Sequence, residues 1–265
     1  MRVALIQMDI AWGDVRQNIL SAEQLVDGEA ADLYVLPEMW ATGYSVHPER
    51  IAENEESSMA LQWMKRKAAE KHCALCGSLA IRDGEGRYVN RHYFVDGSSV
   101  NYYDKHHLFS YAHEDVNYTA GQRHVVVACG GLRLLLQTCY DLRFPVWSRY
   151  GMAGEYDAIV YVANWPEARQ DAWDTLLRAR AIENQCYVIG VNRVGMEKKT
   201  RFTGGSVVID PLGHQIVSCE SCACTRMALL HRHVVDAARQ AFPALDDRDE
   251  PGLIQPCMPA QPARP

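Results

Sequence analysis

The chain has 265 residues, with 27 Lys and Arg against 33 Asp and Glu, a formal net charge of −6 and 48% hydrophobic residues. This length suits one large domain or two small ones, and the composition is that of a globular protein rather than a disordered one. The acidic balance disfavours nucleic-acid binding, and no apolar run approaches the roughly 18 residues of a membrane span. The opening residues include Asp9 and lack the pattern of a secretory signal. We therefore expect a cytoplasmic protein that binds neither nucleic acid nor membrane.

Short apolar runs alternate with amphipathic segments along the chain, which is the pattern of an α/β protein. The continuous apolar run at 2–10 predicts a strand covered on both faces. Apolar residues at helical spacing predict a helix over Val15–Val26. Another apolar run at 32–39 predicts a short strand, because Pro37 disfavours a central strand beyond it.

The same pattern continues to residue 209. A helix is predicted around Met59–His72, and a second helix over Ala172–Asn184. The predicted strands between and after them are 73–83, 87–96, 124–129, 132–139, 158–163, 187–191 and 205–209. Residues 251–265 contain five prolines and predict a flexible or surface-draped tail. No repeat or linker interrupts residues 1–250, which we interpret as one α/β domain.

Two candidate catalytic residues follow apolar strands at their carboxyl ends, where α/β folds place reactive groups. Cys139 ends the run at 132–139, although a single cysteine is often only a core residue. Glu38 follows Val35-Leu36-Pro37, where a carboxylate would not be chosen for packing, although a loop charge explains it equally well. Each residue alone leaves both interpretations open.

Lys105 lies in an aromatic and histidine-rich stretch, Tyr102 to Phe109, and could be either a pocket cation or an exposed lysine. The adjacent His106 and His107 point in different directions on an extended chain, which disfavours a metal site. Glu114 follows nine residues after Lys105 and by itself is only another loop acid.

Nine cysteines make an odd number, and a chain of this size needs no disulfide framework. Thiolate and imidazole ligands are spaced closely enough to raise the hypothesis of a zinc site at His214, Cys219, Cys222, Cys224, His231 and His233. No second C-x-x-C pair accompanies them, so structural or incidental cysteines are favoured over zinc. A redox C-x-x-C site is less favoured still.

Four motifs together resemble the nitrilase superfamily of carbon–nitrogen hydrolases. They are LPEM around Glu38, YDKHHLF around Lys105, HEDVNYTAG with Glu114 and TCYDLRFPVWSR around Cys139. YVANWP at 161–166 and RAIENQCYV at 180–188 match two further landmarks, so the resemblance spans about residues 1–250. FPVWSR followed by YVANWP is similar to the bacterial omega-amidase branch, with Val146 where many members carry a glutamate. The CESCAC segment has no counterpart in the family pattern.

The resemblance implies a four-layer α-β-β-α sandwich of the nitrilase type, paired into a homodimer, with a catalytic set that needs no metal or cofactor. Cys139 would be the nucleophile, and Glu38 would accept its proton and later activate water. Lys105 and the backbone N–H of Tyr140 would stabilise the oxyanion. Glu114 would fix Lys105 and the substrate amide.

The implied activity is an omega-amidase that releases ammonia from 2-oxoglutaramate or 2-oxosuccinamate through a thioester. Arg143 would bind the substrate carboxylate, unless it pairs internally with Asp141 or another acid. Trp165 would form a wall of the pocket, unless it is only a residue of the hydrophobic core. The alternatives are a same-fold hydrolase of another aliphatic amide, an N-carbamoyl compound or a nitrile. A non-catalytic protein, or a metal or redox sensor that uses the 219–224 cysteines, is the alternative from a different class.

Overall fold

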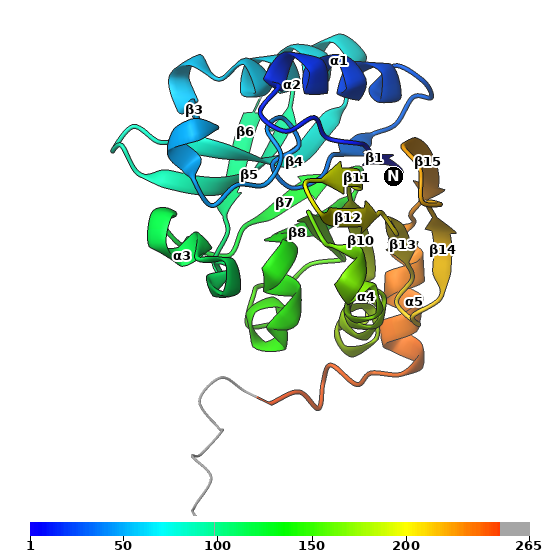
Figure 1. Ribbon diagram of the computed structural model, residues 1–265. Helices are drawn as coiled ribbons and strands as arrows, with labels where there is room; N and C mark the ends of the chain where they lie inside the picture. Colours follow the sequence, from blue (N-terminus) through cyan, green and yellow to red (C-terminus); the bar gives the residue numbers. More distant parts are fainter. Residues whose placement is uncertain (98, 250–265) are drawn as a thin grey trace, which may run out of the picture.

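The computed structural model describes residues 1–97 and 99–249, in which two β-sheets pack face to face with helices on both outer sides (Figure 1). This arrangement confirms the predicted α/β fold with four layers in the order α-β-β-α. The proline-rich segment 251–265 lies outside the described residues.

The larger sheet has the strand order β15-β1-β2-β4-β5-β6, with β3 beside β4. Its strands are β1 (Arg2–Gln7), β2 (Leu33–Val35), β3 (Glu53–Asn54), β4 (Ala74–Arg82), β5 (Tyr88–Asp96), β6 (Ser99–Asp104) and β15 (Cys224–Leu229). The second sheet has the order β14-β13-β10-β9-β8-β7. Its strands are β7 (Val126–Cys129), β8 (Leu132–Thr138), β9 (Ala158–Ala163), β10 (Tyr187–Asn192), β13 (Val207–Ile209) and β14 (Gln215–Ser218). A separate hairpin consists of β11 (Val194–Glu197) and β12 (Thr200–Thr203).

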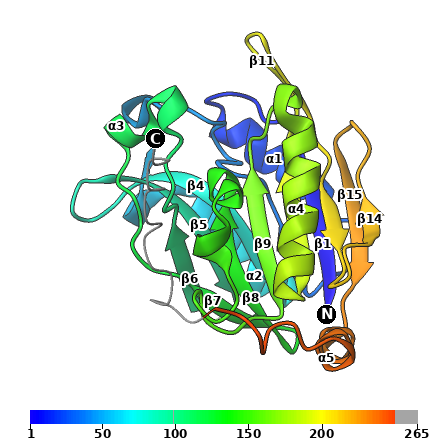
Figure 2. The same cartoon turned by 90° about the horizontal axis from the view of Figure 1, so that it is seen from below.

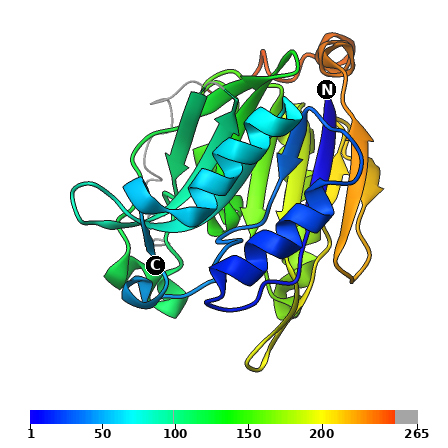
Figure 3. The same cartoon turned by 90° about the horizontal axis from the view of Figure 1, so that it is seen from above.

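The helices form the two outer layers. They are α1 (Val15–Val26), α2 (Met59–Lys71), α3 (Glu114–Asn117), α4 (Gln170–Asn184) and α5 (Arg232–Ala241). Figure 3 shows α1 and α2 side by side over the larger sheet, and Figure 2 shows α4 lying along the second sheet with α5 near the N-terminus. In the part of the chain that the structure describes, no helix has both the length and the apolar character that a bilayer crossing requires.

The first strand shows why the sequence folds into these layers. Val3 and Leu5 point into the core between the two sheets, where Leu134 also packs. Ala4 and Ile6 point the other way, into the core beneath α1 and α2. Because helices or a second sheet cover both faces, the four positions from Val3 to Ile6 are all apolar, rather than every second one. The predicted two-sided burial of this strand is confirmed.

Local capping sets the helix boundaries that the sequence predicted. The Asp14 side chain accepts a hydrogen bond from the backbone of Gln17 at 3.0 Å, so α1 begins at Val15. Ser58 accepts from Leu61 at 3.0 Å in the same way at the start of α2. The predicted strand at 205–209 begins later, at Val207, because the chain turns through positive φ angles of 75° and 74° at Gly204 and Gly205.

The carboxyl ends of several strands meet at one edge of the sandwich. In the larger sheet β2 leads to Glu38 and β6 leads to Lys105. In the second sheet the parallel strands β8 and β9 lead to Cys139 and Asn164. Since such edges carry the sites of α/β proteins, this is where the candidate site is expected.

Candidate active site

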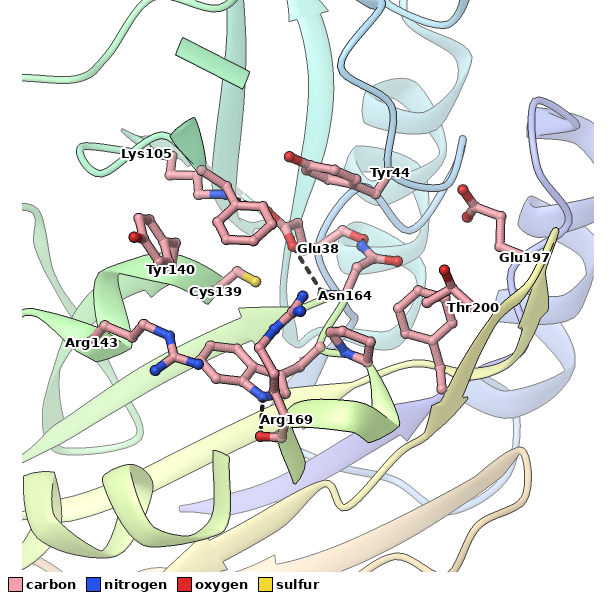
Figure 4. A pocket seen from close by; sticks show the side chains of 14 residues that line it. Glu38, Tyr44, Lys105, Cys139, Tyr140, Arg143, Asn164, Arg169, Glu197 and Thr200 are labelled. Atoms are coloured by element: carbon pink, nitrogen blue, oxygen red, sulfur yellow. Dashed lines mark hydrogen bonds and ion pairs between the residues drawn. The ribbon is translucent and has the colours of Figure 1, made fainter. Parts of the chain in front are cut away.

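Glu38, Lys105 and Cys139 come from three different strand ends and line one pocket (Figure 4). The pocket has a volume of about 180 Å³. Because pockets for drug-sized ligands enclose roughly 300–1,000 Å³, this one suits a small substrate. The structure therefore brings together the three residues that were separated by 67 and 34 positions in the sequence.

Glu38 is fully buried, and both its carboxylate oxygens are held. Its Oε1 accepts hydrogen bonds from Lys105 Nζ at 2.9 Å and from Asn90 Nδ2 at 2.8 Å. Its Oε2 accepts from the backbone N–H of Asn164 at 2.9 Å. The donors come from β5 and from the ends of β6 and β9. A carboxylate held from three directions in this way is preorganised for proton transfer at one place.

Lys105 lies between two carboxylates in the interior of the site. Its Nζ is 2.9 Å from Glu38 Oε1 and 2.8 Å from Glu114 Oε2. Burial alone lowers the pKa of Lys105, but the charges of Glu114 and Glu38 outweigh it and raise that pKa well above its ordinary value. The ammonium group therefore stays charged and acts as a fixed positive charge rather than as a base.

Glu114 is fully buried and holds Lys105 in place, which is the contact that the resemblance implied. Its Oε2 also accepts a hydrogen bond from the backbone of Phe109 at 2.7 Å. The pocket lining includes Glu38, Lys105 and Cys139 but does not include Glu114. A direct contact of Glu114 with the substrate amide stays a prediction.

Cys139 is the first residue of the short helix η4 (Cys139–Arg143), directly after β8. Its φ of 45° lies in the left-handed region, which costs a non-glycine residue about 1–2 kcal/mol. The sharp turn presents the thiol to the pocket. The N–H of Tyr140 follows in the first turn, where helical amides lack intrahelical acceptors, and its contact with an oxyanion stays a prediction.

Burial, and after it the negative charge of Glu38, raises the pKa of Cys139 well above its ordinary value, although Lys105 lowers it. The resting thiol is therefore protonated. The Glu38 carboxylate lines the same pocket as the thiol, and its role as the acceptor of the thiol proton stays a prediction.

Asp141 ties the turn at Cys139 to the loop that carries Lys105. Its fully buried carboxylate accepts hydrogen bonds from Thr138 N at 3.0 Å and from the Tyr103 hydroxyl at 2.8 Å. It also accepts from the backbone N–H of His107 at 2.9 Å, and the His107 ring lies at the same distance. Among the described residues the ion pair of Asp141 is with His107 and not with Arg143, so the alternative that Asp141 pairs with Arg143 is wrong.

We expect Asp141→Ala to lower the free energy of unfolding by about 3 kcal/mol, because several buried donors lose their acceptor at once. Urea denaturation of the variant and of the wild type measures this difference. Asp115→Ala, which removes an exposed acid on α3, is the matched control and should change stability by less than about 0.5 kcal/mol. Equal stability of the two variants would contradict the anchoring role of Asp141.

The two adjacent histidines that raised the question of a metal are engaged elsewhere. His106 Nδ1 lies 2.6 Å from the carbonyl of Gly121, and its ring stacks on Trp147 with centroids 3.6 Å apart. His107 contacts Asp141 and stacks on Phe144. Both rings therefore pack the loop between β6 and α3.

Arg143, Trp165 and Tyr140 all line the pocket, and their roles in substrate binding stay predictions. The Arg143 guanidinium lies 4.9 Å from the centroid of the Trp165 ring. Trp165 is only 3% exposed and also packs against Trp173, so it is both pocket wall and core. The ring of Tyr140 meets Phe144 edge-on.

Several site residues were not predicted as such from the sequence. Asn90 and Asn164 hold Glu38, and only Asn164 gave a signal, because it ends a predicted strand. Tyr44 lines the pocket from a loop, and its buried hydroxyl has no hydrogen-bond partner among the described residues. Burial raises the pKa of Tyr44, so the hydroxyl remains a donor. Arg169 also lines the pocket, from a short 3₁₀ helix at Glu167–Arg169 that shows no periodic pattern in the sequence.

The 219–224 cysteines are not in the lining of this pocket: Cys219 and Cys222 lie in the connection between β14 and β15, and Cys224 begins β15. The cysteines in residues 1–97 and 99–249 are all free thiols. Over those same residues, no three or more His, Cys, Asp or Glu side chains gather in a way that could hold a metal ion.

Comparison with known proteins gives consistent matches over nearly the whole chain. The model of the carbon-nitrogen hydrolase family matches residues 2–240. The chain is 39% identical to the omega-amidase YafV of Escherichia coli K12 over 254 residues, which are 94% of this chain and 97% of that protein. It is 34% identical to the 2-oxoglutaramate amidase of Bacillus subtilis over 251 residues, or 92% and 96% of the two chains.

A solved structure is also similar in fold. XC1258 from Xanthomonas campestris, a CN-hydrolase superfamily protein with an arsenic adduct in its active site, superposes with a TM-score of 0.90 at 35% identity. The alignment covers 94% of this chain and 97% of that one. The four-layer fold therefore has a close structural counterpart.

Proposed function

The chain belongs to the carbon–nitrogen hydrolase family, and from that premise we propose that it is an omega-amidase. It hydrolyses the terminal amide of 2-oxo acid amides such as 2-oxoglutaramate and 2-oxosuccinamate, and releases the 2-oxo dicarboxylate and ammonia. The resemblance to the nitrilase superfamily is confirmed. Sequence identity supports this substrate class. Over nearly its full length the chain is 39% identical to an omega-amidase and 34% identical to a 2-oxoglutaramate amidase.

The proposed first half-reaction forms a thioester on Cys139. The sulfur attacks the amide carbon while Glu38 accepts the thiol proton, which gives a tetrahedral oxyanion. The charged Lys105 and the Tyr140 N–H stabilise the oxyanion. Glu38 then gives the proton to the departing nitrogen as the carbon–nitrogen bond breaks, and ammonia leaves.

The second half-reaction uses the same residues in reverse order. Glu38 removes a proton from water, whose oxygen attacks the thioester carbon. The carbon–sulfur bond breaks, the proton returns to Cys139, and the carboxylate product leaves. Glu114 keeps Lys105 charged and in position throughout, by the contact of 2.8 Å described above.

The experiment that tests the proposal is ammonia release from a panel of substrates. The panel comprises 2-oxosuccinamate, 2-oxoglutaramate, the uncharged butyramide, an N-carbamoyl compound and an aliphatic nitrile. A strong preference for the two oxoacid amides is expected. Ammonia from the uncharged amide, the carbamoyl compound or the nitrile alone would keep the cysteine chemistry but move the protein to another substrate class.

We expect Arg143→Ala to raise KM for 2-oxosuccinamate by about 10–100-fold, because a charge-assisted hydrogen bond to a carboxylate contributes roughly 1.5–3 kcal/mol. KM for butyramide should change by less than about threefold. Initial rates with both substrates measure the difference. An equal loss for both would assign Arg143 a structural role only.

The proposal extends to the organisation of the protein. Residues 1–250 form one carbon–nitrogen hydrolase domain, and two copies form a homodimer whose mass light scattering in solution would measure. The enzyme works in the cytoplasm, where a reducing environment keeps a catalytic thiol such as Cys139 free.

A further inference from the structure

Two guanidinium groups in the pocket lack a negatively charged partner. Arg143 and Arg169 both line it, and neither forms an ion pair with any acid in residues 1–97 and 99–249. The acids of the lining are engaged elsewhere: Glu38 with Lys105 at 2.9 Å and Glu197 with Arg193 at 3.0 Å. Unpaired half-buried cations beside a reactive cysteine indicate a site for an anion.

Aromatic rings hold both arginines in position. Arg143 lies 4.9 Å from the centroid of Trp165, and Arg169 lies 5.4 Å from the centroid of Phe109. Arg169 ends the short helix η6 (Glu167–Arg169), and its carbonyl accepts a hydrogen bond from Trp165 Nε1 at 2.7 Å. Figure 4 shows both side chains extending into the pocket near Cys139. Cation–π contacts leave the N–H groups free and reduce the entropy lost on binding.

The charged side chains of the pocket are distributed so that only one side of it attracts an anion. Lys105 lies between two carboxylates, so the catalytic end holds one more negative charge than positive. The side formed by Trp165 holds the two uncompensated guanidinium charges. A substrate with a neutral amide at one end and an anionic group at the other matches this asymmetry.

We propose that Arg169 is the second half of a two-arginine anion site, which with Arg143 binds the 2-oxo carboxylate end of the substrate while the amide carbon meets Cys139. This inference rests on the proposed function and deepens it. A 2-oxo acid presents three neighbouring acceptor oxygens, and one guanidinium edge pairs with only the two of a carboxylate. The second guanidinium supplies the donor for the remaining oxygen. Arg169 is thus a specificity-determining residue.

The test compares Arg169→Gln with Arg201→Gln. Arg201 is the matched control because it is an arginine on β12 that does not line the pocket, with a side chain 62% exposed and paired with Glu167 at 3.3 Å. In Arg169→Gln we expect kcat/KM for 2-oxosuccinamate to fall by about 100-fold, in line with a lost charge-assisted hydrogen bond. For butyramide the fall should stay below about threefold, and the control should keep both activities. An equal fall for both substrates would overturn the proposal.

A second measurement does not depend on turnover. Iodoacetamide alkylates Cys139, and mass spectrometry of the peptide that contains it follows the rate with and without 2-oxoglutarate. The oxoacid should protect Cys139 in the wild type and in Arg201→Gln but not in Arg169→Gln. Protection that persists in Arg169→Gln would overturn the anion site. Protection that depends on Arg169 in an enzyme inactive on every oxoacid amide would refute the omega-amidase proposal and retain the anion site.

Discussion

Replacing Cys139 with alanine is expected to lower kcat for amide hydrolysis by about 10⁴-fold or more, because loss of a catalytic nucleophile removes the covalent route entirely. No other group in the pocket lining can form a thioester. The fold should persist, since only the sulfur is removed from a partly buried side chain that lines the pocket. Ammonia release and thermal unfolding of the same preparation measure the two properties.

Cys222→Ala provides the matched control for this result. Cys222 is an exposed free thiol in the connection between β14 and β15. Its replacement should leave both the rate and the melting temperature unchanged. Hydrolysis that survives in Cys139→Ala would refute the thioester mechanism, whereas loss in both variants would point to a general effect of thiol removal.

Replacing Glu38 with glutamine is expected to lower kcat by about 10³–10⁴-fold, near the upper range for loss of a general base. Glutamine keeps the shape of the side chain, and its carbonyl oxygen can still accept the hydrogen bond from the Asn164 backbone. It cannot accept the thiol proton or return it to the leaving nitrogen. The side-chain NH₂ of glutamine then faces Lys105 Nζ and Asn90 Nδ2, two donors whose hydrogen bonds Glu38 Oε1 accepts, so the lost rate reports proton transfer together with the loss of these contacts.

Glu38→Gln should lower turnover but increase the reactivity of the Cys139 thiol toward alkylation. The negative charge of Glu38 raises the pKa of Cys139, and the positive charge of Lys105 lowers it. Glu38→Gln removes the negative charge and keeps the positive charge of Lys105. The pKa of Cys139 therefore falls, and its thiolate fraction at neutral pH increases. Alkylation of Cys139 by iodoacetamide should shift to lower pH while turnover collapses.

Glu56→Gln is the control for the change of charge, because Glu56 is an exposed acid outside the pocket. It should alter neither turnover nor the pH profile of alkylation. A profile that moves to higher pH in Glu38→Gln, or turnover that remains near the wild-type rate, would contradict the role of Glu38 as the proton acceptor of Cys139.

The sequence by itself determined the elements whose causes are local. The helices over 15–26 and 59–71 follow from the spacing of their apolar residues. Each begins after a capping side chain that accepts a hydrogen bond from the backbone three residues later, so the bounds could be predicted closely. Strands buried on both faces are continuous apolar runs, which is why the sheet core was predictable. Glu38 and Cys139 were candidates because each follows such a run at its carboxyl end, although each alone left a structural interpretation open. The family motifs then joined them to Lys105.

Tertiary structure alone decided how these residues act on one another. The partner of Asp141 is His107, 34 positions away, rather than the nearby Arg143. Asn90 reaches Glu38 across the larger sheet, and nothing in its strand marks it as part of a site. Arg169 ends the short helix η6, whose sequence carries no periodic signal. Such contacts depend on strand order and on the direction of each side chain, which local propensity does not encode, because they arise only when distant segments pack.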